Sequence, residues 1–244
     1  LTMEKPDVFD EIVKDRRSMR VYDPDVEMPE YVVANSLRRA ILSPSSSNMM
    51  LYEFYRVTKK ENLEVLTRFC LDQSTAKTAH EMVVIVTRGD KYKQRAKLNF
   101  NALQVVFKDN NSKRLKMVSK YYSKIMPMYY NTGFFGLWGG IKKIILWFVG
   151  LRRPIVRIAG NCDIRTVIQK SAALAAQTFM LSVKAEGFDT CPMEGMDSKR
   201  IKKWLKLPRK AEINMVISVG PAKLPEGIYN PRIRPSEEEM IKQM

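Results

Sequence analysis

The feature that most restricts how this chain can fold is a predicted helix with apolar residues on nearly every face. Asp163 is expected to cap its start, and Gly187 is expected to end it. A helix of this kind is buried or lies at a subunit interface, because a helix exposed to water keeps one polar face. Its apolar positions are Ile164, Val167, Ile168, Ala172, Leu174, Ala175, Phe179, Leu181 and Val183.

Two other apolar runs are typical of buried strands. Residues 82–87 and 213–219 are short, rich in β-branched residues and almost free of charge. Helices are predicted to alternate with strands, which indicates the α/β or α+β class with one sheet. Because the chain has 244 residues and no internal repeat, we expect a single domain over residues 1–244. The other predicted helices cover residues 6–17, 29–42, 62–71, 198–205 and 237–244, and residues 91 to about 126 are predicted to be mostly helical.

The positive charge is concentrated in one part of the chain. The formal net charge is +16. Between Arg88 and Gly160 there are 16 Lys and Arg residues against two acidic ones, Asp90 and Asp109, which gives a net +14. The rest of the chain is nearly neutral, so any affinity for membranes or polyanions is expected in this segment.

Residues 121–160 are predicted to be a basic and aromatic insertion within the domain. Residues 133–150 are apolar apart from Lys142 and Lys143, which makes them too short and too charged for a comfortable transmembrane helix. Two interpretations stay open: a lid or dimer-packing element, and an amphipathic contact with a membrane surface through residues 133–153. Nucleic-acid binding is disfavoured, because the aromatic residues cluster in one run. The stripe of this helix would be Leu137, Ile141, Ile144, Ile145 and Phe148.

Cysteine and histidine content exclude several chemistries. Three widely spaced cysteines, Cys70, Cys162 and Cys191, argue against a disulfide framework and indicate a reducing compartment. His80 is the single histidine, so zinc sites and histidine-based triads are excluded and no metal site is expected. The first residues have no apolar signal-peptide region. We therefore expect a cytoplasmic protein, with peripheral attachment to a membrane surface as an open alternative.

Residues 16–20 place three guanidiniums and a hydroxyl within five positions. A guanidinium presents a planar fork of donors that matches phosphate oxygens. Taken alone, such a cluster is more typical of a solvated helix end. Basic composition does not explain it, however, because the chain outside residues 88–160 is nearly neutral. We therefore interpret residues 16–20 as part of an anion site.

Further stretches complete a recognisable pattern. In chain order it consists of Arg16-Arg17-Ser18-x-Arg20, Pro44-Ser45-Ser46-x-Asn48, Cys191-Pro192-Met193-Glu194-Gly195, Leu205-x-Leu207-Pro208 and Arg232-x-Arg234. The ordered set resembles the FMN-dependent nitroreductase family from about Val8 to Ile241, apart from residues 127–160. The resemblance implies an α+β nitroreductase-like fold with a central mixed, mostly antiparallel sheet flanked by helices. It also implies a homodimer with swapped tails and FMN at the subunit interface.

The resemblance assigns roles to these residues. Arg16, Ser18, Arg232 and Arg234 would hold the FMN phosphate, while Arg17 could equally face solvent. Arg20 would lie near the N1–O2 edge of the flavin, and the role of Arg16 is divided between phosphate and ring. The 192–195 turn would bring a backbone N–H to flavin N5, and Gln73 would meet the pyrimidine edge. The loop at 44–48 would come from the partner subunit. The implied cofactor-binding residues are Arg16, Arg17, Ser18, Arg20, Pro44, Ser45, Ser46, Asn48, Gln73, Pro192, Met193, Glu194, Gly195, Arg232 and Arg234.

One position departs from the family pattern: Met50 stands where members often have Gln. The implied activity is an FMN-dependent NAD(P)H oxidoreductase that reduces nitroaromatics, quinones or similar flat molecules by ping-pong hydride transfer through flavin N5. No side chain need be catalytic, and the thiol of Cys191 is more typical of a buried structural cysteine. Alternatives are a reductive dehalogenase, a flavin-fragmenting enzyme, or a membrane-surface flavoprotein with a hydrophobic substrate.

Overall fold

A computed structural model describes residues 4–107, 113–133 and 137–244. Its centre is a four-stranded sheet in the order β1-β2-β4-β3, in which every neighbouring pair is antiparallel. The strands are β1 (Tyr52–Val57), β2 (Glu81–Arg88), β3 (Asp189–Met193) and β4 (Ala211–Gly220). The parallel component of the expected mixed sheet is limited, in the described residues, to an isolated bridge between Ser18 and Thr190.

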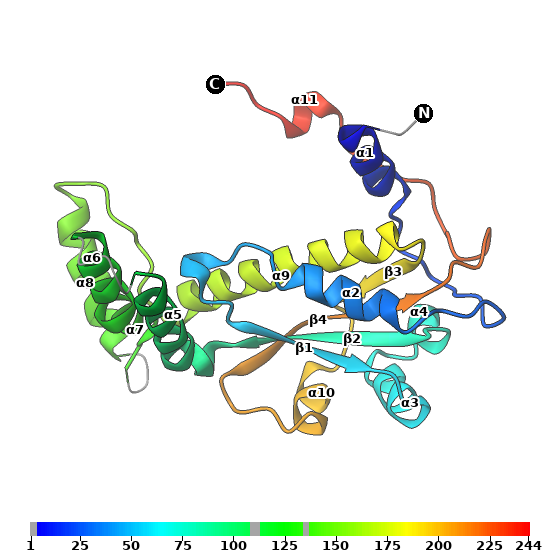
Figure 1. The fold of residues 1–244 in the computed structure, drawn as a ribbon, viewed down its shortest axis with the longest axis horizontal. Helices are drawn as coiled ribbons and strands as arrows, with labels where there is room; N and C mark the ends of the chain where they lie inside the picture. Colours follow the sequence, from blue (N-terminus) through cyan, green and yellow to red (C-terminus); the bar gives the residue numbers. More distant parts are fainter. Residues whose placement is uncertain (1–3, 108–112, 134–136) are drawn as a thin grey trace.

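Helices surround this sheet and extend beyond one end of it (Figure 1). Short 3-10 turns cover Ser46–Asn48 and Gly89–Lys91, and a π-helical turn covers Tyr121–Ile125. The α-helices are α1 (Lys5–Asp15), α2 (Tyr31–Ala40), α3 (Lys60–Phe69), α4 (Ser74–Lys77), α5 (Tyr92–Val106), α6 (Lys113–Lys120), α7 (Met126–Tyr130), α8 (Leu137–Gly150), α9 (Asn161–Ala185), α10 (Ser198–Trp204) and α11 (Glu237–Met240).

Strand β2 is the centre of two apolar cores, one on each face of the sheet. Val83 and Ile85 pack toward α2 and α9, whereas Met82, Val84 and Val86 pack toward α3 and α10. Successive side chains of a strand point to opposite faces, so a continuous apolar run buries both faces at once. The prediction of a central strand at residues 82–87 is confirmed.

Helix α9 is the longest helix of the described chain and lies along the sheet (Figure 1). Its start is closed by Asp163, whose carboxylate accepts the backbone N–H of Gly160 at 2.9 Å. Gly187 follows its end with φ of +86°, a left-handed conformation that suits glycine. Most apolar residues of α9 are buried, but Leu174 is 50% exposed, next to exposed Ala173 and Gln177, so this face is not covered within the subunit.

Helices α5 to α8 form a projection at the far left of Figure 1, beyond one end of the strands. A third apolar cluster ties this projection to the rest of the protein through Met49, Leu51, Tyr130, Ile164 and Ile168. The helix suggested by the apolar stripe is present as α8. Within the described ranges, no helix has the length and apolar character needed to cross a bilayer.

Strand β3 was not predicted as a strand. Residues 192–195 were expected to form a turn, but Pro192 and Met193 pair with Ile217 and Val216 of β4. Proline is tolerated there because β3 is the last strand of the sheet within the chain. Glu194 and Gly195, which follow the strand, have irregular backbone and are exposed.

Candidate functional site

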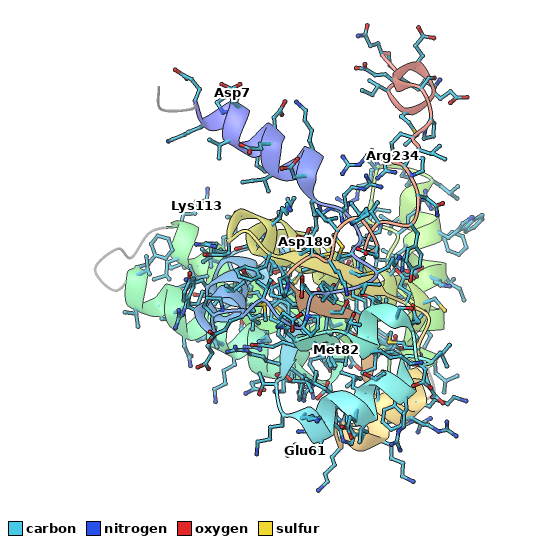
Figure 2. All side chains as sticks on the ribbon, turned by 90° about the vertical axis from the view of Figure 1, so that its right-hand side faces the viewer. Asp7, Glu61, Met82, Lys113, Asp189 and Arg234 are labelled. Atoms are coloured by element: carbon cyan, nitrogen blue, oxygen red, sulfur yellow. The ribbon has the colours of Figure 1, made fainter. Side chains whose placement is uncertain are left out.

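The N-terminal arginine cluster and the C-terminal tail together line a cleft of about 350 Å³. The two segments are more than 200 residues apart in the chain, and the structure brings them together. Figure 2 shows the tail with Arg234 outside the layer of the sheet that holds Met82. The lining residues are Arg16, Arg17, Ser18, Arg20, Ile228, Tyr229, Asn230, Pro231, Arg232, Ile233 and Arg234.

The 16–20 segment is held in an extended conformation beside β3. The Met19 amide donates to the Thr190 carbonyl at 3.1 Å, and the Arg20 amide donates to the Gly227 carbonyl at 2.8 Å. Met19 is 2% exposed. Because side chains alternate along an extended segment, burial of Met19 turns Ser18 and Arg20 toward the cleft.

A buried network of hydroxyl groups forms hydrogen bonds with residues 16–20 from the interior of the protein. Thr75 donates its Oγ1 hydrogen to the Met19 carbonyl at 2.7 Å, and Ser218 contacts both Thr75 at 2.7 Å and Tyr22 at 2.9 Å. Burial raises the pKa of the Tyr22 hydroxyl, which therefore stays neutral. Sequence reasoning missed these residues, because three hydroxyls scattered over 200 positions form no local pattern.

The five arginines that line the cleft have no carboxylate partner within the described residues. Arg16 is the clearest case, because its side chain also makes no hydrogen bond to any described residue. Burial, and then the charges of Arg232, Arg234 and Arg17, lower the pKa of Arg16. Partly buried cations that repel one another favour a bound anion.

Two of the arginines also donate hydrogen bonds to backbone carbonyls. Arg17 donates to the carbonyl of Asn230 at 2.6 Å. Arg232 donates to the carbonyls of Lys14 and Arg16, both at 2.7 Å. A cation at the C-terminal end of α1 satisfies carbonyls that the helix leaves unpaired. Arg16 therefore has the largest number of donors left for a ligand, and Arg234 keeps most of its donors because it contacts only the carbonyl of Ile233.

Cys191 lies under the arginine cluster but is buried. Arg20 Nη1 lies 3.4 Å from its sulfur. Burial raises the pKa of the thiol, and the nearby charge of Arg20 opposes this only in part. A neutral buried thiol is a poor nucleophile, which favours the structural interpretation.

At the other end of β3, Gln73 and Gly195 are in direct contact. Gln73 Nε2 donates to the carbonyl of Gly195 at 2.7 Å and to the carbonyl of Cys70 at 2.9 Å. Residues 71 and 72, just before it, both have left-handed φ values of 59° and 53°. The amide of Gln73 thus fixes the exposed turn at residues 194–195, although the two segments are far apart in sequence.

The loop at residues 44–48, called the serine loop below, does not lie at this cleft. The Ser46 amide donates to Ser171 Oγ at 3.2 Å, near the middle of α9, while Ser45 Oγ accepts the amide of Met50. The exposed Asn48 exchanges hydrogen bonds with Asn99 of α5. The arginine cluster lies near the C-terminal end of α9, about 20 Å further along at 1.5 Å per residue. Pro44, Ser45, Ser46 and Asn48 are therefore separated from the arginines within one chain.

Met50 and His80 each have a structural role within the subunit. Met50 packs against the core between the sheet and α9, so the thioether at this position contributes to packing within the subunit. His80 donates a ring N–H to the carbonyl of Asp23 at 2.8 Å. Neither residue lines the cleft.

Comparison with known proteins identifies the family of the chain. The model of the nitroreductase family matches residues 13–221. The Bacillus subtilis protein YdgI, provisionally named as an NAD(P)H nitroreductase, is 25% identical over 221 residues, which is 90% of this chain and 91% of the relative. MhqN of the same organism, provisionally named in the same way, is 43% identical over a short stretch of 54 residues, or 22% of this chain and 26% of that relative.

A solved structure shows the same fold. It is a protein from Exiguobacterium sibiricum, provisionally described as a nitroreductase and crystallised in complex with FMN. The two share 20% identity, the TM-score is 0.70, and the alignment covers 100% of this chain and 99% of that one. The family model spans far more than half of the chain, including the 16–20 segment, the serine loop and β3. The chain therefore belongs to the nitroreductase family.

Proposed function

We propose that this protein is an FMN-dependent NAD(P)H oxidoreductase that reduces nitroaromatics, quinones or similar flat small molecules. The observation that supports this most directly is the cleft lined by five arginines without a carboxylate partner among the described residues. The names of YdgI and of the FMN-bound neighbour supply the reductant and the cofactor of the proposal.

The donors in the cleft fit the phosphate of FMN. A phosphate dianion would compensate the repulsion that lowers the pKa of Arg16, and the unpaired donors of Arg16 and Arg234 would bind its oxygens. Arg20 and Ser18 face the same cleft. Arg17 and Arg232 would contribute charge and hold the two segments in place.

Strand β3 connects the phosphate end of the proposed site to the turn at Gly195. Thr190 pairs with Ser18, and Gly195 lies five residues later, which is about 16 Å in an extended strand. An elongated ligand lying along β3 would therefore meet both the arginines and the exposed backbone of residues 194–195. An added Cβ at Gly195 would meet Gln73 Nε2 at an ordinary contact distance of 3.6 Å, so packing within the subunit does not require glycine at this position.

We infer that a second subunit completes the site. The serine loop of one chain is too far from its own arginine cluster to share a ligand with it. Helix α1 has no buried residue, and the tail leaves Ile233, Met240 and Ile241 exposed. In the proposed homodimer these surfaces would be covered, and the serine loop of each subunit would reach the arginine cleft of the other.

The protein residues would position and stabilise the reactants. Bound FMN would supply the redox chemistry, namely transfer of a hydride between nicotinamide and acceptor. Arg20 would place a positive charge beside the ring, which favours its reduced, anionic form. The guanidiniums stay charged, Tyr22 stays neutral, and the Cys191 thiol stays buried, so none of these groups is suited to proton transfer near neutral pH.

An absorbance spectrum of the purified protein tests the proposal. We expect a yellow protein with flavin bands, which bleach on anaerobic addition of NADH or NADPH and recover on addition of a quinone or nitroaromatic. Colourless protein that also fails to bind added FMN would contradict the proposal. Turnover of halotyrosines instead of quinones would point to the dehalogenase alternative.

A further inference from the structure

The surface of α8 is the strongest unexplained feature outside the cleft. Leu137, Ile141, Ile144 and Phe148 follow one another along a single helical stripe and are between 49% and 70% exposed. Trp147, beside this stripe, is 55% exposed. Exposed stripes of large apolar residues mark an interaction surface, because water would otherwise cover a contiguous apolar patch.

The polar side of α8 faces the protein. Lys142 donates its Nζ hydrogens to the carbonyls of Asn131 at 2.8 Å and Tyr129 at 3.0 Å, at the end of α7. Desolvation lowers the pKa of this lysine. Gly139 lies on the same side, where an added Cβ would come within 3.1 Å of the carbonyl of Ala159. These contacts fix the rotation of α8, so its apolar stripe points away from the subunit.

Cations surround the C-terminal end of this stripe. Phe148, Val149 and Leu151 line a hollow of about 600 Å³ together with Arg152 and Arg153. Both arginines are exposed, and neither guanidinium makes a hydrogen bond or ion pair to any described residue. The hollow thus combines an apolar wall with two free guanidiniums, a pairing that suits an acyl chain next to a phosphate.

Charge decides which partner fits this surface. A second copy of the same segment would bring its own net +14 against the first, which disfavours self-association through α8. An anionic lipid surface matches the stripe and the cations at once, and exposed tryptophan is typical of the lipid–water interface. We propose that α8 docks the protein onto the surface of an anionic bilayer, with the apolar stripe among the headgroups and Arg152 and Arg153 at lipid phosphates.

Sedimentation with vesicles tests this proposal on the purified, intact protein. We expect it to bind vesicles of equal parts phosphatidylglycerol and phosphatidylcholine much more strongly than pure phosphatidylcholine. The double change Ile144→Asp and Phe148→Asp is expected to abolish binding. The double change Arg152→Ala and Arg153→Ala is expected to weaken it about 25-fold, since each basic residue near such a surface contributes about fivefold.

Matched controls separate docking from general charge and folding effects. Arg209→Ala with Lys210→Ala removes an exposed basic pair of the same spacing outside the projection, and Leu42→Asp changes an 81% exposed leucine elsewhere. Both should bind vesicles like the unchanged protein, and all variants should keep its melting temperature. A blue shift of tryptophan emission with anionic vesicles should accompany binding.

Three outcomes would overturn the proposal. They are no sedimentation of the unchanged protein, equal binding by the Ile144→Asp/Phe148→Asp variant, and a smaller oligomer for that variant without any vesicle binding. The last outcome would assign the stripe to a second copy of the chain. None of these results depends on FMN or on activity, so the proposed oxidoreductase function is tested separately.

Discussion

Arg16 is the residue whose environment points most directly to a ligand. Its side chain is half-buried, has no partner among the described residues, and is repelled by Arg17, Arg232 and Arg234. A group in this position stabilises a bound anion and destabilises the free protein, because like charges are held together without compensation. Its effects on binding and on stability should therefore have opposite signs.

Replacement of Arg16 by Ala is expected to weaken FMN binding about 10- to 100-fold, since a hydrogen bond to a charged group contributes about 1.5–3 kcal/mol. The same change should leave the melting temperature of the FMN-free protein equal or higher. Titration of the free protein with FMN and a thermal melt measure the two effects. Arg38→Ala, on the exposed side of α2, serves as control and should change neither. Parallel loss of affinity and stability would assign Arg16 a structural role.

The three cysteines should differ sharply in reactivity. Cys162 is exposed, whereas burial raises the pKa of Cys70 to about 12 and also raises the pKa of Cys191. A maleimide at neutral pH is therefore expected to label one site in the folded protein and three in denaturant. Mass spectrometry of tryptic peptides identifies the site. Rapid labelling of Cys191 in the folded protein would revive its interpretation as a reactive thiol.

At the scale of elements, α1 depends on the C-terminal tail. No residue of α1 is buried, and Arg232 binds two backbone carbonyls at the end of the helix. Helix α1 lies away from the sheet in Figure 1, and Figure 2 shows that the body of α1 and the terminal helix α11 diverge beyond this contact. The tail thus organises the arginine cleft as well as contributing to it.

Replacing Arg232 by Ala should let α1 open more easily. Loss of its charged hydrogen bonds is expected to speed hydrogen exchange of the last α1 amides by about tenfold or more, without affecting α9. Exchange measured by mass spectrometry tests this. Arg234→Ala is the matched control, since Arg234 contacts only the carbonyl of its neighbour Ile233. Equal exchange in both variants would mean that other contacts hold α1.

A charged cluster lies at the start of β1 and the end of β2, and its contribution to stability should decrease at low pH. Partial burial raises the pKa of Glu53, but hydrogen bonds from Lys91 and Arg88 outweigh it, and the pKa lies below the usual range. A carboxylate with a lowered pKa stabilises the fold above its unfolded value of about 4.3 and loses this contribution as the pH falls through the folded pKa. Urea midpoints between pH 7 and pH 3 should fall less steeply for Glu53→Gln than for the unchanged protein. Parallel curves would contradict the prediction.

At the scale of the whole molecule, the serine loop lies near the middle of α9 and the arginine cleft near its C-terminal end. The proposed dimer would combine the two groups from different subunits. Mixed dimers separate this arrangement from a site within one chain, because the two arrangements predict different numbers of intact sites.

We expect FMN binding to be lost when both subunits carry Arg16→Ala with Arg234→Ala, or when both carry Ser46→Ala with Asn48→Ala. A mixed dimer with one subunit of each kind should bind one FMN, because the intact arginines of one subunit meet the intact loop of the other. Differently tagged, co-expressed subunits and absorbance of the purified mixed dimer give the stoichiometry. A mixed dimer without FMN, alongside mutant homodimers that are also empty, would place the whole site in one chain.

The sequence by itself determined those features that depend only on residues close together in the chain. The central strand at 82–87, the long apolar helix before Gly187 and the arginine cluster at 16–20 follow from periodicity, chain breakers and charge, which act over a few positions. Only the tertiary structure decided that Pro192 lies in an edge strand, that Lys142 turns the apolar side of α8 outward, and that the hydroxyls of Tyr22, Thr75 and Ser218 form a buried network under the arginine segment. These outcomes depend on contacts between distant segments, whose energies no local pattern contains.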